Sequence, residues 1–192
     1  NIRGNFQALT NYSIVISSEL SDRWGDELGS DYSLTFSTSP LRPNLMITYT
    51  TNALFLTPQD EMMPVQATNL SVVNLEIGTI PEMYFSDFLA GDTYSVLKNF
   101  NPPDRRSWQY AINLPGDQSY DASLPLNPEE TSLAPGLYLY RATSPTLNYN
   151  PSGYLLVVSH IQLTLKVSSN DILVWAVDLR TNEPVSGAPI EV

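Results

Sequence analysis

Two stretches near the carboxy-terminal end of the sequence decide the fold class: Ile161-Gln-Leu-Thr-Leu-Lys-Val167 and Ile172-Leu-Val-Trp-Ala-Val177. In the first stretch, apolar and polar side chains alternate with a period of two, which is typical of a β-strand with one dry face and one wet face. The polar turn Ser168-Ser-Asn-Asp171 separates the two stretches, so together they predict a β-hairpin.

Further strands are predicted on either side of this hairpin. Pro135-Gly136 opens the strand Leu137-Tyr-Leu-Tyr-Arg-Ala142, and a loop rich in Pro and Asn then leads to another strand at residues 154–159. Pro184 and Gly187 bracket a turn that introduces a last strand at the end of the sequence.

The order of these motifs resembles the N-terminal macroglobulin-type domains of the bacterial alpha-2-macroglobulins. The resemblance rests on a Pro-Gly-Leu-Tyr-Leu strand from Pro135, a Leu-Val-Val-Ser strand from Leu156, an Ile-Leu-Val-Trp-Ala-Val-Asp-Leu strand from Ile172 and a Pro-Val-Ser-Gly-Ala-Pro-Ile turn from Pro184. It covers the sequence from about residue 41 to residue 192 and implies a macroglobulin-like β-sandwich.

The resemblance also implies a function. Family members are broad-spectrum protease inhibitors of the bacterial periplasm or cell surface. A protease cleaves their bait segment, and many members then capture it through a Cys-Gly-Glu-Gln thioester. This chain has no cysteine and therefore no thioester, and the bait segment of the family lies further along. The implied role is a structural scaffold fragment, in the periplasm or outside the cell, with any membrane anchor elsewhere in the parent protein. Its partners would be neighbouring domains and, through the full-length protein, target proteases.

Composition shifts divide the chain into three parts. Residues 1–39 hold two strand signals and resemble the last strands of a bacterial Ig-like domain. Pro40 and Pro43 indicate a linker, because proline imposes an extended backbone that makes few hydrogen bonds. Residues 41–159 form the predicted macroglobulin-like sandwich, and residues 160–192 form the first strands of a following macroglobulin-like domain. Because both ends interrupt such modules, we expect the chain to be a piece of a longer protein.

The fold class predicted is all-β, an antiparallel β-sandwich of the macroglobulin or Ig-like kind. One short helix is expected over residues 81–90, where Pro81 suits a first helical turn and apolar side chains recur near helical spacing. Tyr84, Phe85 and Phe88 in this helix are either core residues or an exposed patch for a partner. The remaining strands are predicted at residues 12–17, 32–37, 45–50, 53–57, 63–67, 70–77, 108–114 and, as a short edge strand, 124–126.

The charge and composition exclude several classes of protein. The net charge of −11 argues against a nucleic-acid ligand and against an anionic membrane surface, since both require an excess of Lys and Arg. The absence of cysteine excludes disulfides, thiolate metal sites and a cysteine nucleophile. No apolar run reaches the 18 or more residues typical of a membrane span.

Few residues offer catalytic or metal-binding chemistry. The one histidine, His160, lies at a predicted module boundary, where we expect its ring to be satisfied by backbone or solvent. The acidic pairs Asp60-Glu61 and Glu129-Glu130 lie in polar loops rich in proline. Four carboxylates lie between the first two predicted strands, at Asp22, Asp26, Glu27 and Asp31. Clustered carboxylates suggest a calcium site, but their spacing does not fit an EF-hand. A solvated loop is the preferred interpretation. We therefore expect no enzyme activity, catalytic residue, cofactor or metal.

An alternative function is an Ig-like surface adhesion or carbohydrate-binding module. Such a module would display a platform of exposed aromatic rings, drawn from Trp24, Trp108, Tyr110, Tyr138 and Tyr140. Rings open to solvent would favour this alternative, and buried rings would favour a scaffold. The glycosylation-type sequences at Asn11 and Asn69 are taken as incidental, because the resemblance is to bacterial proteins.

Overall fold

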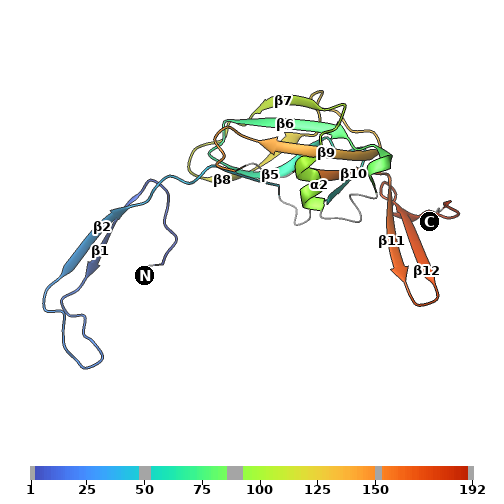
Figure 1. Cartoon of the computed structure of the whole chain (residues 1–192). Helices are drawn as coiled ribbons and strands as arrows, with labels where there is room; N and C mark the ends of the chain where they lie inside the picture. Colours follow the sequence, from blue (N-terminus) through green and yellow to red (C-terminus); the bar gives the residue numbers. More distant parts are fainter. Residues whose placement is uncertain (1–2, 48–52, 86–92, 150–152, 190–192) are drawn as a thin grey trace.

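The computed structural model describes residues 3–47, 53–85, 93–149 and 153–189. Figure 1 shows a central β-sheet body, with a β-ribbon projecting from each of its opposite ends. The all-β sandwich predicted from the alternation of apolar and polar residues is therefore confirmed.

The larger sheet has five strands, in the order β4-β10-β9-β6-β7. Neighbouring strands run antiparallel except for β4 and β10, which are parallel. This pair differs from the fully antiparallel sheet predicted. It arises because β4 joins the sheet edge from a different part of the chain, so no hairpin sets its direction. The bounds are Ala53–Leu56 (β4), Tyr154–Val158 (β10), Gly136–Thr143 (β9), Val72–Thr79 (β6) and Arg106–Ala111 (β7).

The smaller sheet has three antiparallel strands, β3 (Asn44–Ile47), β5 (Met62–Thr68) and β8 (Ser119–Pro125). Alternate side chains of both sheets point inward and form one apolar core. Its largest fully buried members include Leu54, Met63, Val65, Val73, Leu75, Ile77, Leu124, Leu126, Tyr140 and Leu156. Each such side chain contributes about 1.5–3 kcal/mol when fully buried, which explains how a sandwich without disulfides is held together.

A second, smaller apolar cluster lies on the outer face of the larger sheet. The connection between β6 and β7 crosses this face and carries a 3₁₀ turn, η1 (Glu82–Tyr84), and a helix, α2 (Thr93–Asn99). Leu97 of α2 is fully buried against Leu139 and Leu155 of the sheet and Ile80 of the connection. The larger sheet is therefore covered on both sides over part of its area.

The two ribbons are each built from one hairpin. At the amino-terminal end, β1 (Asn11–Ile16) pairs antiparallel with β2 (Tyr32–Ser37). At the carboxy-terminal end, β11 (Ile161–Val167) pairs antiparallel with β12 (Ile172–Asp178), as its alternation predicted, and β12 pairs with the two-residue strand β13 (Glu183–Pro184).

Several expectations differ from the structure in detail. Helix α2 was not predicted. The start of the predicted helix at residues 81–90 is a 3₁₀ turn, and its later part lies outside the described residues.

The strand predicted from residue 70 begins at Val72, because Asn69 has a left-handed backbone (φ 51°) that makes a turn. The short edge strand predicted at residues 124–126 is the end of a longer strand, β8 (Ser119–Pro125). Proline limits the strand only at its end. A two-residue strand, β13, precedes Gly187, and the predicted strand after it lies partly outside the described residues.

Gly78 on β6 is a close-packing position and gives the first prediction. A Cβ at Gly78 would lie 2.3 Å from Cβ of Pro102, which belongs to the connection that crosses the outer face. Gly78→Ala is therefore expected to lower the free energy of unfolding by about 1–3 kcal/mol through overpacking. Chemical denaturation measures this, and Gly116→Ala, where the nearest atom is 3.9 Å away, is the matched control. Equal stability of the two variants would contradict the packing described.

Candidate functional site

The groups that could support catalysis are far apart in the chain's architecture. The Nδ1 atom of His160 is buried, and no hydrogen-bond partner for it lies in the part of the chain that the structure describes. His160 as a whole is half-buried where the sandwich passes into β11, and within the described residues its Nδ1 atom meets no backbone acceptor or donor. The backbone carbonyl of His160 accepts a 2.8 Å hydrogen bond from the Leu179 N–H.

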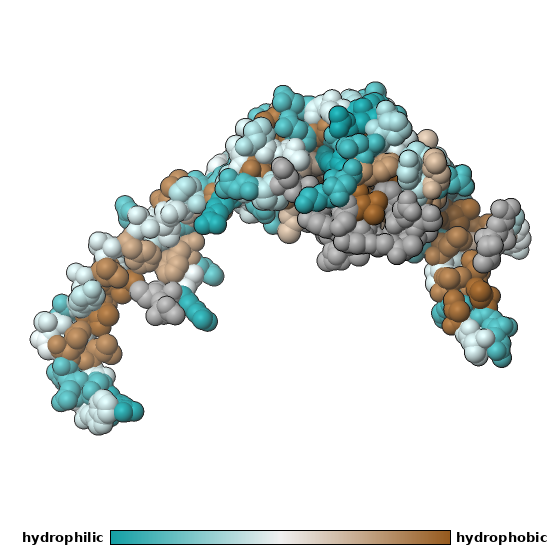
Figure 2. Space-filling model, viewed as in Figure 1, coloured by the Kyte–Doolittle hydropathy of each residue, from teal (hydrophilic) through white to brown (hydrophobic). Residues whose placement is uncertain are grey.

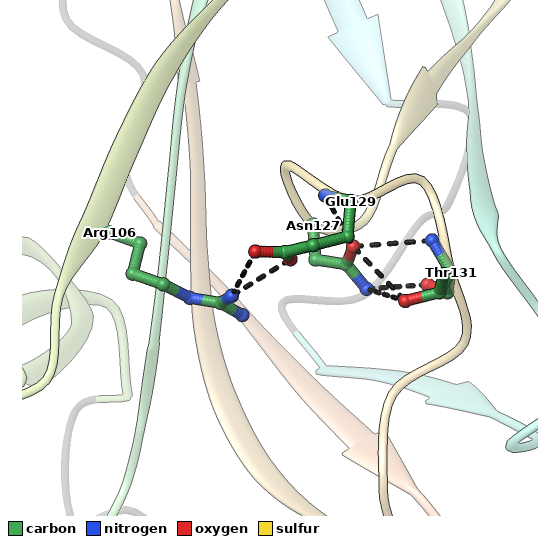
Figure 3. A network of polar contacts seen from close by, with 4 residues as sticks. All are labelled: Arg106, Asn127, Glu129 and Thr131. Carbon is green, nitrogen blue, oxygen red and sulfur yellow. Dashed lines mark hydrogen bonds and ion pairs between the residues drawn. The ribbon is translucent and has the colours of Figure 1, made fainter.

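One member of each acidic pair, Asp60 or Glu129, binds groups close by in the structure. The Asp60 carboxylate accepts hydrogen bonds from the N–H (2.6 Å) and the hydroxyl (2.9 Å) of Thr57, and so closes the turn after β4. Figure 3 shows the second pair's loop: Glu129 accepts 2.9 and 3.1 Å hydrogen bonds from Arg106 at the start of β7. The buried Asn127 side chain accepts hydrogen bonds from the N–H groups of Glu129 and Thr131. Within the described residues, the printed partners of Asp60 and Glu129 are a threonine and an arginine, whereas glycoside hydrolysis requires two carboxylates across a cleft.

The carboxylates of the loop between β1 and β2 cap backbone groups. Asp22 accepts hydrogen bonds from the N–H groups of Trp24 (2.8 Å) and Asp26 (3.1 Å), and Asp31 accepts one from Ser18 (2.7 Å). Across residues 3–47, 53–85, 93–149 and 153–189, no group of three or more His, Asp or Glu side chains could hold a metal ion. Two of the four acidic residues, Asp22 and Asp31, thus use their carboxylates to bind backbone groups of the hairpin loop.

The five candidate rings of an aromatic platform do not form one surface. Tyr140 is 0% exposed and donates a 3.0 Å hydrogen bond to the carbonyl of Pro125. Trp108, Tyr110 and Tyr138 pack against the main core. Trp24 is 73% exposed at the tip of the amino-terminal ribbon, with the Arg23 guanidinium 3.9 Å from its ring centre. One of the five rings is buried and three are partly buried against the core, which favours a scaffold over a carbohydrate-binding surface.

An ion-pair network that the sequence did not reveal fastens helix α2 to the sheet. Arg141 on β9 donates to Glu76 on β6 (2.6 Å) and to the carbonyls of Leu97 (2.7 Å) and Phe100 (2.6 Å) at the end of the helix. Arg105 approaches the other oxygen of Glu76 at 3.6 Å. Arg141 therefore supplies the donors that the last carbonyls of a helix otherwise lack.

The amino-terminal ribbon has one apolar face and one polar face. Its register places the aromatic and aliphatic side chains opposite one another on one side, which we call the amino-terminal face: Tyr12, Ile14, Ile16, Tyr32, Leu34 and Phe36. Phe6 covers only one end of this face, with its ring centre 5.0 Å from that of Tyr12 and 5.5 Å from that of Phe36. Side chains of the opposite side are serine, threonine and asparagine, with Val15 the exception.

The carboxy-terminal ribbon is also uncovered. One side, which we call the carboxy-terminal face, carries Ile161, Leu163, Leu165, Val167, Ile172, Val174 and Ala176. Most of these side chains are exposed, and Leu165 is 61% exposed. At the base of the ribbon, Ile161 and Leu163 line a hollow of about 330 Å³ with Phe55 and Val157 of the sandwich. Figure 2 shows hydrophobic side chains along both ribbons.

The two faces are the candidate functional surface of the chain. Apolar surfaces of this kind, when left uncovered, mark sites of interaction with other protein segments. The strand alternation predicted the dry side of Ile161–Val167 from the sequence, whereas for the amino-terminal ribbon only the two strands were predicted. It did not predict the role of Arg141, nor the hydrogen bonds that Asn69 and Asp117 make to Leu41, because these contacts join residues far apart in the chain. The only sequence signal for Asn69 and Asp117 was the frequent use of Asn and Asp at left-handed turns, which both adopt here (φ 51° and 57°).

The fold and these surfaces define a class of structure: a β-sandwich of two sheets with a β-ribbon at each end. A crystal structure of native alpha-2-macroglobulin from Escherichia coli, spanning domains MG0-NIE-MG1, has a similar fold, with a TM-score of 0.62, 16% identity, and coverage of 94% of this chain and 60% of that one. A Salmonella alpha-2-macroglobulin mutant, Y1175G, is similar with a TM-score of 0.65 and 15% identity over 91% of this chain and 10% of that one.

A shorter Escherichia coli structure, spanning domains NIE-MG1, has a TM-score of 0.60 and 15% identity, with coverage of 75% of this chain and 73% of that one. These likenesses confirm, at the level of the fold, the resemblance seen in the sequence motifs. The chain spans only 60% of the first of these structures and 10% of the second. No family model matches the sequence. The curated proteins contain no match either. Within the described residues, no helix is long and apolar enough to cross a membrane.

The Arg141 network gives a prediction for stability. Arg141→Ala is expected to lower the free energy of unfolding by about 1–3 kcal/mol, because it removes charge-assisted hydrogen bonds from partly buried partners. The side chains of Arg141 and Glu76 are only 16% and 20% exposed. Arg106→Ala, which breaks an exposed ion pair, is the matched control and should cost about 0–1 kcal/mol. Urea unfolding measures both, and an Arg106 effect as large as that of Arg141 would contradict this assignment.

Tyr140 gives a prediction for alkaline pH. Burial raises the pKa of the Tyr140 hydroxyl far above its ordinary value of 10.0. The unfolded chain therefore releases this proton first, so the neutral hydroxyl stabilises the fold below pH 10 and that contribution is lost as the pH rises further. Tyr140→Phe should be less stable at pH 7, by about 1–3 kcal/mol, because the Pro125 carbonyl loses its donor. Its stability should fall less steeply between pH 10 and 12 than that of the unmodified chain.

Urea unfolding at a series of pH values measures this slope. Tyr32→Phe, which changes an exposed ring, is the control and should leave the slope unchanged. A Tyr140→Phe variant with the same slope as the unmodified chain would show that another group governs alkaline stability.

Proposed function

We propose that this chain is a structural scaffold segment of a bacterial alpha-2-macroglobulin-like protease inhibitor of the periplasm or cell surface. In this proposal the segment has no enzymatic activity of its own. Its partners are the neighbouring domains of the same polypeptide, and it meets target proteases only through the full-length protein. The observation that carries the proposal is the combination of one closed sandwich with an uncovered apolar ribbon at each end.

The ribbons support this proposal because an isolated two-stranded sheet is at best marginally stable in water. Each ribbon presents one apolar side whose burial requires a second layer. In the proposal the amino-terminal ribbon ends an Ig-like domain, residues 41–159 form a macroglobulin-like sandwich, and residues 160–192 begin the next macroglobulin-like domain. The fold likeness to structures spanning successive alpha-2-macroglobulin domains agrees with this division.

The distribution of chemical groups also supports a scaffold. The acidic side chains of the loops bind backbone groups or arginine instead of facing one another. Four of the five candidate platform rings pack on the core, one fully and three partly buried, which leaves Trp24 as the one widely exposed ring of the set. The sandwich therefore contributes shape and rigidity to a larger molecule.

The inhibitor function is tested on the full-length parent protein mixed with trypsin. A protease trap should abolish cleavage of a large protein substrate while cleavage of a small chromogenic substrate continues, because the trapped active site remains open to small molecules. Unchanged cleavage of the large substrate would remove the inhibitor function from the proposal.

The role of the carboxy-terminal face is tested by a charge placed on either side of β11. Leu165→Asp should destabilise the full-length protein by several degrees in its melting temperature, because it buries a charge between modules. The same change should leave the isolated 192-residue chain nearly unaffected, since Leu165 is 61% exposed there. Thr164→Asp, on the opposite side of the strand, is the matched control. Equal effects of Leu165→Asp in the long and short chains would contradict coverage of this face.

A further inference from the structure

The amino-terminal ribbon keeps a defined position without apolar packing against the sandwich. Of its described side chains, none belongs to either apolar cluster. Where the segment before β1 approaches the sandwich, it encloses a hollow of about 640 Å³ lined by residues 6–9, Leu41 and residues 116–118. The orientation of the ribbon must therefore be set by the linker that joins it to the sandwich.

The part of the linker that is free to bend is short. Thr38 is tied to the base of the ribbon, because its N–H donates to the Thr10 carbonyl and its hydroxyl accepts from the Thr10 N–H, both at 3.0 Å. On the sandwich side, the Tyr149 hydroxyl bonds the Asn44 side chain and the Leu45 carbonyl at 3.0 Å. Only residues 39–43 lie between these two anchors.

Four of these five residues are restricted by proline chemistry. The rings of Pro40 and Pro43 fix their own φ angles. Each proline also restricts the residue before it, which is Ser39 or Arg42, to extended conformations. Leu41 is the one residue of the linker whose φ and ψ are restricted in neither way.

Both backbone groups of Leu41 are held by side chains of the sandwich. The Leu41 N–H donates to Oδ1 of Asp117 at 2.8 Å, and the Leu41 carbonyl accepts from Nδ2 of Asn69 at 2.7 Å. The two side chains are also joined to each other: Asn69 Nδ2 donates to Asp117 Oδ1 at 3.1 Å, and the Asp117 N–H donates to Asn69 Oδ1 at 2.6 Å. Both backbone groups of Leu41 and both ends of the Asn69 side-chain amide are therefore matched.

We propose that Leu41 is the pivot of a latched hinge, and that Asn69 and Asp117 are the latch. With the latch closed, the ribbon and the sandwich hold one relative orientation. With the latch open, the chain turns about Leu41 and the ribbon takes many orientations. The latch residues lie on the β5–β6 turn and the β7–β8 loop, so this device links both sheets to the module before them. The proposal rests on the linker geometry and does not depend on the function of the parent protein.

The latch also explains how the glycosylation-type sequence at Asn69 is used. The Nδ2 atom, to which a glycan would be attached, already donates hydrogen bonds to Leu41 and Asp117. The backbones of Asn69 and Asp117 are both left-handed, a conformation that glycine adopts without strain. Glycine substitutions therefore remove the latch side chains and preserve both turns.

The experiment measures the distance between two spin labels by pulsed electron resonance in the 192-residue chain. The chain has no cysteine, so labels at Ser13→Cys on the ribbon and Ser107→Cys on the sandwich are free of background. We expect a narrow distribution of label-to-label distances in the chain with the latch intact. In the double variant N69G/D117G the distribution should be at least about twofold wider, because the linker then contains an unrestricted residue. The distance distribution should stay narrow in the variant Asp117→Asn, which retains the Oδ1 acceptor. It should also stay narrow in Asp121→Gly, the control that removes an exposed carboxylate outside the latch.

A second label pair within the sandwich, Ser107→Cys and Ser123→Cys, separates hinge motion from loss of structure. Its distribution should be the same with and without N69G/D117G. If this pair widens as much as the first, the network holds the sandwich and not the linker, and the proposal is overturned. It is also overturned if the ribbon-to-sandwich distribution is equally narrow, or equally wide, in the unmodified chain and in N69G/D117G.

Discussion

Every strand of this protein must bury one apolar face, and the arrangement of the chain follows from how far that requirement is met. In the sandwich, the inward faces of the two sheets meet each other, and Met63, Leu75 and Leu156 are almost completely removed from water. In the two ribbons the same alternation produces an apolar face with no opposing layer. The sandwich is therefore closed, whereas the ribbons are open surfaces.

The connections determine how these parts are joined. Arg141 holds helix α2 over the outer face of the larger sheet by binding the carbonyls at the end of the helix. Asn69 and Asp117 hold the linker by binding both backbone groups of Leu41. In both places a polar side chain of the sandwich binds backbone groups of a connecting segment, which fixes the position of that segment.

The sequence predicted what depends on neighbouring residues and missed what depends on distant ones. The alternation in Ile161–Val167 and Tyr32–Ser37 was sufficient to predict strands, and the motif order from Pro135 to Gly187 was sufficient to identify the fold. Helix α2 was missed because its short sequence has little apolar periodicity, and its position depends on Leu97 docking beneath Arg141. The parallel pairing of β4 with β10 and the latch at Leu41 join residues about a hundred and about seventy-six positions apart, and no local pattern reports such contacts.

The central claim, that one closed sandwich carries two open ribbons, is tested most directly by native-state hydrogen exchange of the isolated chain. Amides of the central strands β6 and β9 should exchange only by global unfolding, because both neighbours of each strand are paired and the core covers them. Amides of the β11–β12 ribbon should exchange through local opening at a clearly lower free energy. Equal protection of the ribbon and the central strands would contradict the account, because it would show that the ribbon is already part of a closed core.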